Sequence, residues 1–256
     1  DNYAELTLKT MSAPSVQAVL DFSRKLTASG KPYGQKDVEQ MTELAREDGI
    51  TELQAYDTAY YSDKLKKKLY DFDEEQLRPY FAKESVLNCM FEILRQMFGI
   101  TFKAKEAKLW DDKAVFYAIY RDGALTAGLY MDLEARPDKR GGAWMNEWHT
   151  HCKDAEDNVH LPEAYVVANF PVSKDGQPSL LRHDDVTTLF HEMGHALHHL
   201  MSKVEEYNVS GVHGIDWDTV EFPSQFLENF AYAPQVLDML AKHHETGEKM
   251  PDELRD

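Results

Sequence analysis

The sequence predicts a predominantly α-helical protein with one small β-sheet, which is an α+β fold. Apolar residues recur at spacings of three and four through much of residues 15–98 and again through 186–204, the period of helices with one buried face. Between these regions, residues 100–172 contain the β-branched and aromatic runs that are typical of strands. We therefore expect three parts of a single domain: a helical segment 1–99, a sheet and loop segment 100–182, and a second helical segment 183–256.

Two helices are expected in the first fifty residues. The first covers 15–29 and the second about 36–47, with a break at Ser29-Gly30-Lys31-Pro32 and an end at Asp48-Gly49. The first helix has an apolar stripe formed by Val16, Val19, Leu20, Phe22 and Leu26. The inward side chains expected of the second are Val38, Met41, Leu44 and Ala45.

Two further helical regions are predicted at 53–70 and 73–98. The first carries the apolar side chains Tyr56, Tyr60, Tyr61, Leu65 and Leu69, and its lysine run is expected to be a solvated face. Pro79 interrupts the second, which is therefore a helix or a broken pair of helices. Gly99 is expected to end this helical region. The side chains assigned to its core are Phe91, Leu94, Met97 and Phe98.

The clearest strand signal is a hairpin. Residues 115–120 and 125–133 flank Asp122-Gly123, a dipeptide that favours the two-residue turns of antiparallel hairpins. Residues 164–170 are a further strand candidate. The stretch 136–144 contains Gly141 and Gly142, which indicate a turn with positive φ, a close backbone contact or an ordinary loop.

The last long helix is predicted within 185–204, and Asp184 or Asp185 is available to cap its start. Two of its histidines, His191 and His195, are four residues apart and therefore share one helix face, one turn above the other. They lie roughly opposite the apolar stripe. That stripe consists of Val186, Leu189, Phe190, Met193, Leu197, Leu200, Met201 and Val204.

The pattern His191-Glu192-Met193-Gly194-His195 is a candidate metal site, because two imidazoles on successive turns can bind one ion, usually Zn²⁺. Glu192 lies about 100° around the helix from His191, where its carboxylate can reach a water on the ion without binding the ion. Alone, the pattern is equally compatible with a solvated histidine face. Gly194 costs roughly 1 kcal/mol relative to alanine. A close approach of another backbone would explain it, and the alternative is a tolerated glycine without a role.

A catalytic zinc usually has three protein ligands and one water. His198 and His199 continue the same straight helix, and His198 lies roughly 10 Å along the axis from His191, so we interpret both as surface groups or as partners of the ligands. Glu221, in the following segment 218–230, is a better third ligand. However, Asp218-x-x-Glu221 is also a capping box, and the spacing leaves the two interpretations equal. Three other histidines are not expected to contact the ion: His149, His151 and His160.

The paired segments FHEMGHALHHL and WDTVEFPSQFLENF resemble the zinc site of the M3 oligopeptidases, the thimet oligopeptidase and neurolysin family. The connecting SGVHGIDWD loop is most similar to bacterial members, and 136–144 resembles the R-x-x-K-x-x-G-A-W segment of the family. The resemblance implies a partial zincin-like, neurolysin-type catalytic domain. It further implies one zinc ion per chain, with His191, His195 and Glu221 as ligands and Glu192 as the base.

The resemblance also implies that this chain is an interior piece, covering about the middle third of a longer protein. In the family, a glycine- and tyrosine-rich segment that follows this region contacts the substrate, and nothing after Glu228 matches it. The substrates implied are short peptides, cleaved in a channel that excludes folded proteins. The other expected partners are the N- and C-terminal parts of the same protein.

Charge and cysteine content narrow the class of protein. The net charge of −17 argues against binding to nucleic acid or to an anionic membrane surface, and it is compatible with binding cationic peptides. No apolar run approaches the ~18 residues of a membrane span. Cys89 and Cys152 form no disulfide framework, so we expect free thiols in the cytoplasm. No signal peptide is visible, although the chain starts at Asp1 and not at methionine.

The sequence motifs thus predict metal-assisted amide hydrolysis by a zinc-activated water with Glu192 as general base. Together with the resemblance, they predict a zinc metallopeptidase, and the resemblance implies that it is an endo-oligopeptidase hydrolysing internal amide bonds of short peptides. Residues expected to orient the histidines are Asp218, Gln225 and Glu228. Either 165–170 or 141–144 is expected to be the sheet edge that binds an extended substrate.

Three alternatives remain open at this stage. The first is that the chain is a zinc-binding but inactive fragment. The second is that it is a peptide- or partner-binding module whose histidine face has no function. The third is that it is a dipeptidyl carboxypeptidase of the same family.

Overall fold

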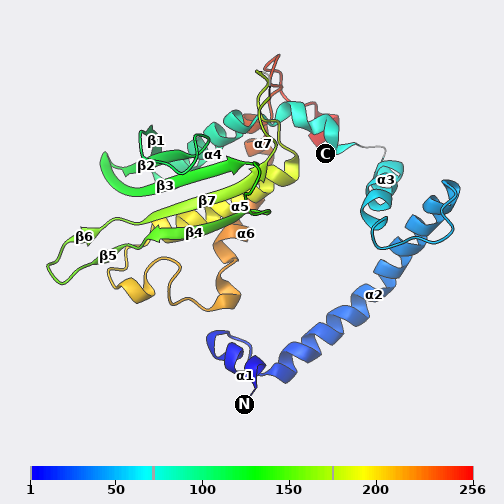
Figure 1. Cartoon of the computed structure of the whole chain (residues 1–256), viewed down its shortest axis with the longest axis horizontal. Helices are drawn as coiled ribbons and strands as arrows, with labels where there is room; N and C mark the ends of the chain where they lie inside the picture. Colours follow the sequence, from blue (N-terminus) through cyan, green and yellow to red (C-terminus); the bar gives the residue numbers. More distant parts are fainter. Residues whose placement is uncertain (1, 71–72, 175, 256) are drawn as a thin grey trace. The chain divides into compact units, whose positions relative to one another are not determined.

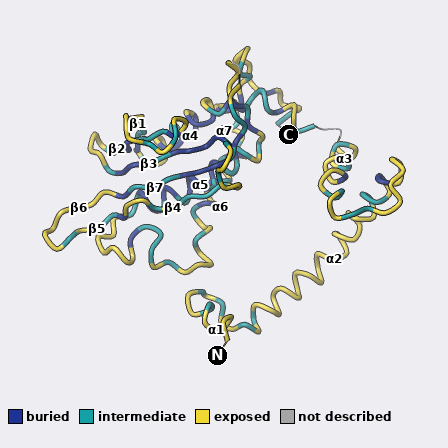
Figure 2. The backbone as a smooth tube through the Cα atoms, viewed as in Figure 1, coloured by how far each residue is buried: buried dark blue, intermediate teal, exposed yellow. Residues whose placement is uncertain are grey.

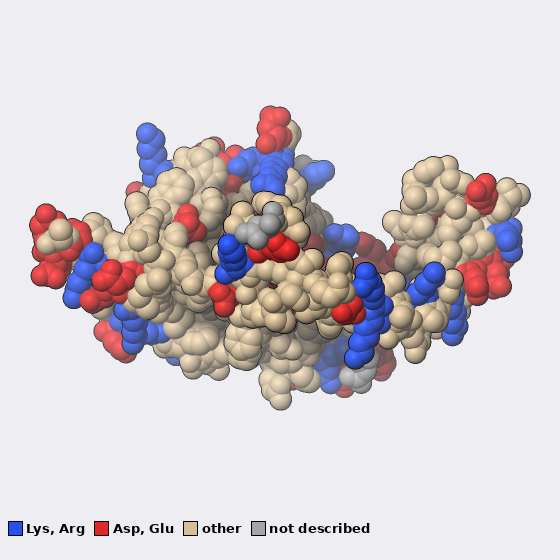
Figure 3. All heavy atoms as spheres, turned by 90° about the horizontal axis from the view of Figure 1, so that it is seen from below, with Lys and Arg blue, Asp and Glu red and all other residues tan. Residues whose placement is uncertain are grey.

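The computed structural model describes residues 2–70, 73–174 and 176–255, which form two compact units, residues 1–73 and 74–256. Helices, one small mixed sheet and a two-stranded ribbon account for the regular structure of the described residues, so the predicted α+β class is confirmed (Figure 1). On the face seen in Figure 3, acidic and basic side chains of the described residues are interspersed, without a broad area of either sign. None of the described helices combines the length and apolar character that crossing a bilayer requires.

The first unit contains α1 (Tyr3–Thr7), a 3₁₀ turn (Leu8–Thr10), α2 (Val16–Glu47) and α3 (Thr58–Tyr70). α2 begins where the Ser15 hydroxyl accepts the Ala18 N–H, and ends before Gly49, whose φ is 86°. It is one helix of 32 residues, so the break predicted at 29–32 is wrong. A proline removes only one backbone hydrogen bond and distorts one turn. In α2 the turns on both sides of Pro32 continue the helix.

The core of this unit is small. Leu44, Ala45 and Tyr61 are buried, with Met41, Leu53 and Leu65 packed around them. The expected stripe at the start of α2 is not a buried face, because four of its five side chains are exposed and Val16 is only partly buried (Figure 2). Other exposed side chains that were expected to face inward or to be apolar contacts are Val38, Tyr56, Tyr60 and Leu69. The reason is that α3 packs against the C-terminal turns of α2. There Lys64 and Lys68 form ion pairs with Asp48 and Glu47.

The second unit starts with a 3₁₀ helix (Glu74–Tyr80) and α4 (Lys83–Phe98), which confirms the broken pair predicted around Pro79. Gly99 ends α4 with a φ of 68°. Leu94 is fully buried in the core, as predicted. The core assignment of Met97 is wrong, since this side chain, in the last turn of α4, is 37% exposed.

Five strands form the main sheet in the order β1-β2-β3-β7-β4. Their bounds are β1 Ile100–Lys105, β2 Val115–Arg121, β3 Ala124–Glu134, β4 Trp144–His149 and β7 Glu163–Phe170. The predicted hairpin is confirmed, with positive φ at both turn residues, Asp122 and Gly123. β3 and β7 pair in parallel, and the other pairs are antiparallel. A separate two-stranded ribbon consists of β5 (Cys152–Lys153) and β6 (Val159–His160).

The sheet order places β4 at one edge. β7 lies between β3 and β4, so the hypothesis that 165–170 is a sheet edge is wrong. Neither β1 nor β4 was predicted as a strand. The alternative edge, predicted at 141–144, touches β4 at Trp144, where β4 begins.

One face of the sheet packs against α5 (His183–Leu200), which contacts β7, β4 and β3 (Figure 1). Six members of the predicted α5 stripe, Val186 through Leu200, are buried. After α5 the chain forms two 3₁₀ turns (Tyr207–Val209 and Trp217–Thr219) and α6 (Phe222–Glu228). It continues through a 3₁₀ turn (Asn229–Ala231), α7 (Pro234–Leu240) and α8 (Asp252–Arg255).

Candidate metal centre

Three side chains from two helical segments meet at one point. The Nε2 atoms of His191 and His195, on α5, lie 3.2 and 3.1 Å from Oε2 of Glu221. Their ring centroids are 4.9 Å apart, as expected for imidazoles on successive turns. Among the described residues this is the one group of His, Cys, Asp and Glu side chains with the spacing of a metal site. The structure therefore brings together the three residues predicted as ligands.

Glu221 is held by the start of α6. It is the N-cap residue of that helix, and its carboxylate Oε2 accepts a 2.8 Å hydrogen bond from the Ser224 hydroxyl. The capping-box interpretation needs a helix that starts after Asp218. Instead, Asp218 lies in the preceding 3₁₀ turn, and α6 begins at Phe222. The Glu221 carboxylate consequently faces the two imidazoles.

Gly194 lies where α5 and α6 come into contact. A Cβ atom on this residue would be 2.5 Å from the carbonyl oxygen of Pro223 and 2.6 Å from Cα of Ser224. Both distances are well below van der Waals contact. The close backbone approach inferred from the sequence is therefore present, and it holds the start of α6, with Glu221, against the histidine face.

A second carboxylate fixes the first imidazole. Glu228, the last residue of α6, places Oε1 2.5 Å from Nδ1 of His191. A carboxylate accepts hydrogen bonds, so this contact favours the tautomer with the proton on Nδ1 and a free lone pair on Nε2. Of the three residues predicted to orient the histidines, Glu228 does contact a histidine, His191. Gln225 is exposed on α6.

Glu192, the residue after His191 on α5, is only 7% exposed. Burial raises the pKa of its carboxyl above the ordinary value, and the negative charge of Glu221 adds to this effect. The neighbouring His191 imidazole and a hydrogen bond from the backbone N–H of Met145, on β4, act in the opposite direction. Burial also lowers the pKa of His195, which favours its neutral, metal-binding form. The Glu192 carboxylate thus contacts the edge strand β4 from its position on α5.

A cleft of about 530 Å³ opens beside these residues. It is lined by β4 and by the loop 212–220, and His195 and Glu221 form part of its wall. The cleft is large enough for a few side chains of an extended ligand.

The other histidines have separate roles. His199 is fully buried, and its Nε2 lies 2.8 Å from the carbonyl oxygen of His149. Its interpretation as a surface group or a partner of the ligands is therefore wrong, because the helix turns this side chain into the core, against Gly211. His160 pairs with Asp154 on the β5–β6 ribbon.

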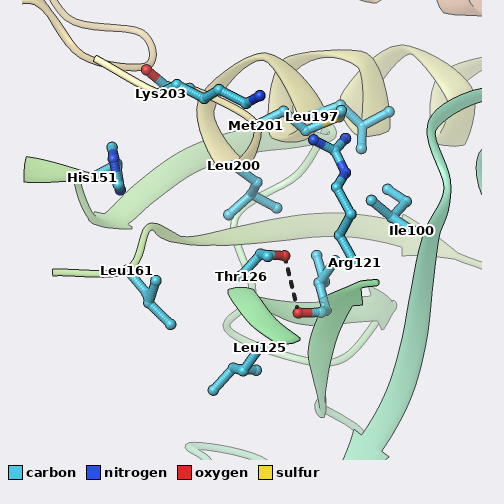
Figure 4. A pocket seen from close by; sticks show the side chains of 12 residues that line it. Ile100, Arg121, Leu125, Thr126, His151, Leu161, Leu197, Leu200, Met201 and Lys203 are labelled. Carbon is cyan, nitrogen blue, oxygen red and sulfur yellow. Dashed lines mark hydrogen bonds between the residues drawn. The ribbon is translucent and has the colours of Figure 1, made fainter. Parts of the chain in front are cut away.

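A second, smaller cavity of about 180 Å³ lies near the C-terminal end of α5 and contains none of the three clustered residues (Figure 4). Its lining is largely apolar, and the Arg121 guanidinium points toward Leu197 and Met201. A cation near the C-terminus of a helix is favourable by itself.

The donor set at the cluster suits a divalent ion. A tetrahedral zinc site has Zn–N and Zn–O bonds of about 2.0–2.1 Å, which place neighbouring ligand atoms about 3.3 Å apart. The two N···O separations of 3.2 and 3.1 Å lie close to this value. Two neutral imidazoles and one carboxylate are also ligands that zinc prefers.

Comparison with known proteins adds independent information. The sequence matches the model of Peptidase family M3 over residues 1–256. It is 42% identical to Oligopeptidase A of Escherichia coli (strain K12) over 259 residues, which cover 100% of this chain and 38% of that protein.

Two other relatives are similar over the same span. Probable cytosolic oligopeptidase A of Arabidopsis thaliana is 35% identical, covering 99% of this chain and 37% of that protein. Dipeptidyl carboxypeptidase of Salmonella typhimurium is 36% identical, covering 100% and 38%. The chain therefore spans about two fifths of the length of these relatives.

Proposed function

Since this chain belongs to peptidase family M3, we propose that it carries the zinc site of a metallopeptidase that hydrolyses internal amide bonds of short peptides. The observation that carries the proposal is the meeting of His191, His195 and Glu221 at one point, with two N···O separations close to those of a zinc site. The names of the oligopeptidase A relatives support short peptides as the substrate class.

In this proposal the Nε2 atoms of His191 and His195 and the carboxylate of Glu221 hold one zinc ion per chain. When bound, zinc lowers the pKa of a coordinated water towards ~7 and polarises the carbonyl of the scissile bond. Glu228 keeps the His191 ring in the orientation and tautomer that binding needs. Gly194 allows the approach of α6 that brings Glu221 within reach.

Glu192 is the general base. Its carboxylate takes a proton from the attacking water and later delivers it to the nitrogen of the leaving amine. Its place on α5, one residue after His191, directs it away from the ligand atoms. The hydrogen bond from the Met145 N–H fixes it against the edge strand.

The edge strand β4 is the proposed binding strand for the substrate. Its one partner among the described strands is β7, which leaves the other side of β4 available to a peptide in extended conformation. Backbone hydrogen bonds would then hold the peptide, and they tolerate varied sequences. The peptide would run past Glu192 and along the cleft.

Zinc analysis and a peptidase assay test the proposal together. We expect the purified chain to bind one equivalent of zinc, and we expect hydrolysis of an internally quenched peptide with both ends blocked. Substitution of His195 by alanine should remove both. A folded chain that binds no zinc at micromolar concentration would overturn the proposal.

Two other functions have specific support. The 36% identity to a dipeptidyl carboxypeptidase favours release of C-terminal dipeptides, which requires a free C-terminus. Product mapping on blocked and unblocked peptides distinguishes the two activities. Because the chain spans 38% of the length of Oligopeptidase A, zinc binding without hydrolysis is the other alternative. Adding the parts of the protein that flank this region would restore activity in that case.

A further inference from the structure

The cleft beside the candidate metal centre has mainly apolar walls. They are formed by Met145 on β4 and by Val212, Ile215, Trp217 and Val220 of the loop between α5 and α6. Trp217 lines the cleft and is 66% exposed, so its side chain is accessible to a ligand. These walls suit the methylene groups of a long side chain.

Two carboxylates line the same cleft. That of Glu221 is directed at the two imidazoles. Glu147 follows Met145 by two residues on β4, and alternate residues of a strand share a face, so its side chain lies on the same side of the strand as Met145. Glu147 is therefore a negative charge at the wall of the cleft that the cluster does not use.

Among the described residues, His213 lies beside Glu147. Its Nε2 lies 3.6 Å from Oε1 of Glu147, which is too long for a hydrogen bond. The same Nε2 atom is buried and has no hydrogen-bond partner among the described residues. The Glu147 carboxylate, whose side chain is 32% exposed, therefore retains its capacity to accept hydrogen bonds from a ligand.

We propose that this cleft binds a lysine or arginine side chain of the peptide substrate, and that Glu147 is the specificity-determining residue that selects the positive charge. The aliphatic stem would lie along the apolar walls, and the cationic end would meet the carboxylate. Trp217 offers a cation–π surface in the same cleft.

The position of β4 supports this arrangement. Side chains of a peptide added to this edge alternate between the two faces of the sheet, and those on the face of Met145 and Glu147 enter the cleft. The inference rests on the proposed function for the path of the peptide. The charge preference itself can be measured on the metal-free chain, without hydrolysis.

The test compares two blocked tripeptides that differ in one charge: acetyl-Gly-Arg-Gly-amide and its citrulline analogue, which has nearly the same shape and no charge. Their dissociation constants are measured by titration calorimetry on the intact chain in the presence of a chelator. We expect the arginine peptide to bind about fivefold more tightly, the upper range for a solvent-accessible ion pair.

Glu147→Gln should remove this preference, while the affinity for the citrulline peptide stays unchanged. Glu156→Gln is the matched control, since it removes the same charge from the exposed β5–β6 loop and should keep the preference. His213→Gln should also keep it, because the proposal assigns selection to Glu147 and not to the Glu147–His213 pair.

Equal affinity of the wild-type chain for both peptides would overturn the inference. So would a preference that survives Glu147→Gln, one that is lost in His213→Gln, or no detectable binding of either peptide at millimolar concentration. Failure of the proposed function has a different signature, because absent zinc binding or absent hydrolysis leaves these metal-free dissociation constants unaffected.

Discussion

Gly194 and Pro223 are in backbone contact: a methyl group on Cα of Gly194 would lie 2.5 Å from the Pro223 carbonyl oxygen. This contact joins the helix that carries both histidines to the helix that begins after Glu221. It is a property of two segments about thirty residues apart, and it controls the geometry of the cluster.

Gly194→Ala should therefore destabilise the second unit and weaken zinc binding. The higher helix propensity of alanine would stabilise α5 by roughly 1 kcal/mol. The added methyl group, however, overpacks the contact with α6, which typically costs 1–3 kcal/mol and should displace α6. Urea unfolding and zinc titration measure the two effects. Gly30→Ala is the matched control, because Gly30 lies inside α2 with nothing within 4 Å of a new Cβ, and it should stabilise its helix. Equal or greater stability of Gly194→Ala would contradict the account.

Glu221→Ala should lower the zinc affinity by at least a hundredfold, because it removes one of three protein ligands. The metal-free chain should remain folded, since the Glu221 side chain is half exposed and its removal leaves no cavity in the core. Competition with a chromophoric chelator measures the affinity. An unchanged affinity and stoichiometry would show that the glutamate is not a ligand.

Glu228→Gln tests the orientation of His191. The variant keeps the shape of the side chain but weakens the hydrogen bond from the Nδ1–H, and loss of such a partner typically costs 10–100-fold in metal affinity. We therefore expect a smaller loss than for Glu221→Ala, measured by the same competition. Asn229→Ala, which changes the next residue without touching the imidazoles, should leave the affinity as in the wild type.

Much of this centre was accessible from the sequence because its determinants are local. The four-residue spacing of His191 and His195 requires only a helix, and the α5 stripe identifies that helix and its buried face. Spacing alone left Glu221 equally balanced between a ligand and a cap. The balance is decided by the point at which α6 begins, and this depends on the packing of Gly194 against Pro223.

The errors arise where long-range packing decides. Pro32 is a strong local signal for a break, yet it removes one hydrogen bond from a helix of 32 residues. β4 was not recognised as a strand because WMNEWH mixes polar and aromatic residues, which an edge strand with a single partner tolerates. Glu147 belongs to no motif. Only the strand pairing that places β4 beside α5 brings it to the cleft.

Glu192→Gln separates binding from chemistry. The amide keeps the shape of the side chain and removes the basic carboxylate, so zinc should remain bound at full stoichiometry. Hydrolysis should fall by 10²–10⁴-fold, the usual contribution of a general base. The comparison is made in whichever form of the protein shows wild-type peptidase activity. Surviving activity, or loss of the metal, would remove Glu192 from the role of base.

The environment of Asp132 leads to a prediction about the pH dependence of stability that does not involve the metal. Asp132 is almost completely buried on β3 and accepts hydrogen bonds from Trp110, Arg136 and Lys139. Burial alone would raise the pKa of this carboxyl. These hydrogen bonds and the Lys139 charge outweigh burial and hold the pKa well below its ordinary value.

A folded-state pKa below the unfolded value means that the stabilisation is complete above the unfolded value, about 3.9, and is lost as the pH falls from there through the folded value. Asp132→Asn should cost about 3–5 kcal/mol at pH 7, because the nearly buried Lys139 loses its counter-charge. Urea unfolding at several pH values should give a constant difference from the wild type between pH 7 and about 5, and a smaller one below about 4. Asp112→Asn, at an exposed position, is the control and should run parallel to the wild type. A difference that grows on acidification would mean that the carboxylate is not the stabilising form.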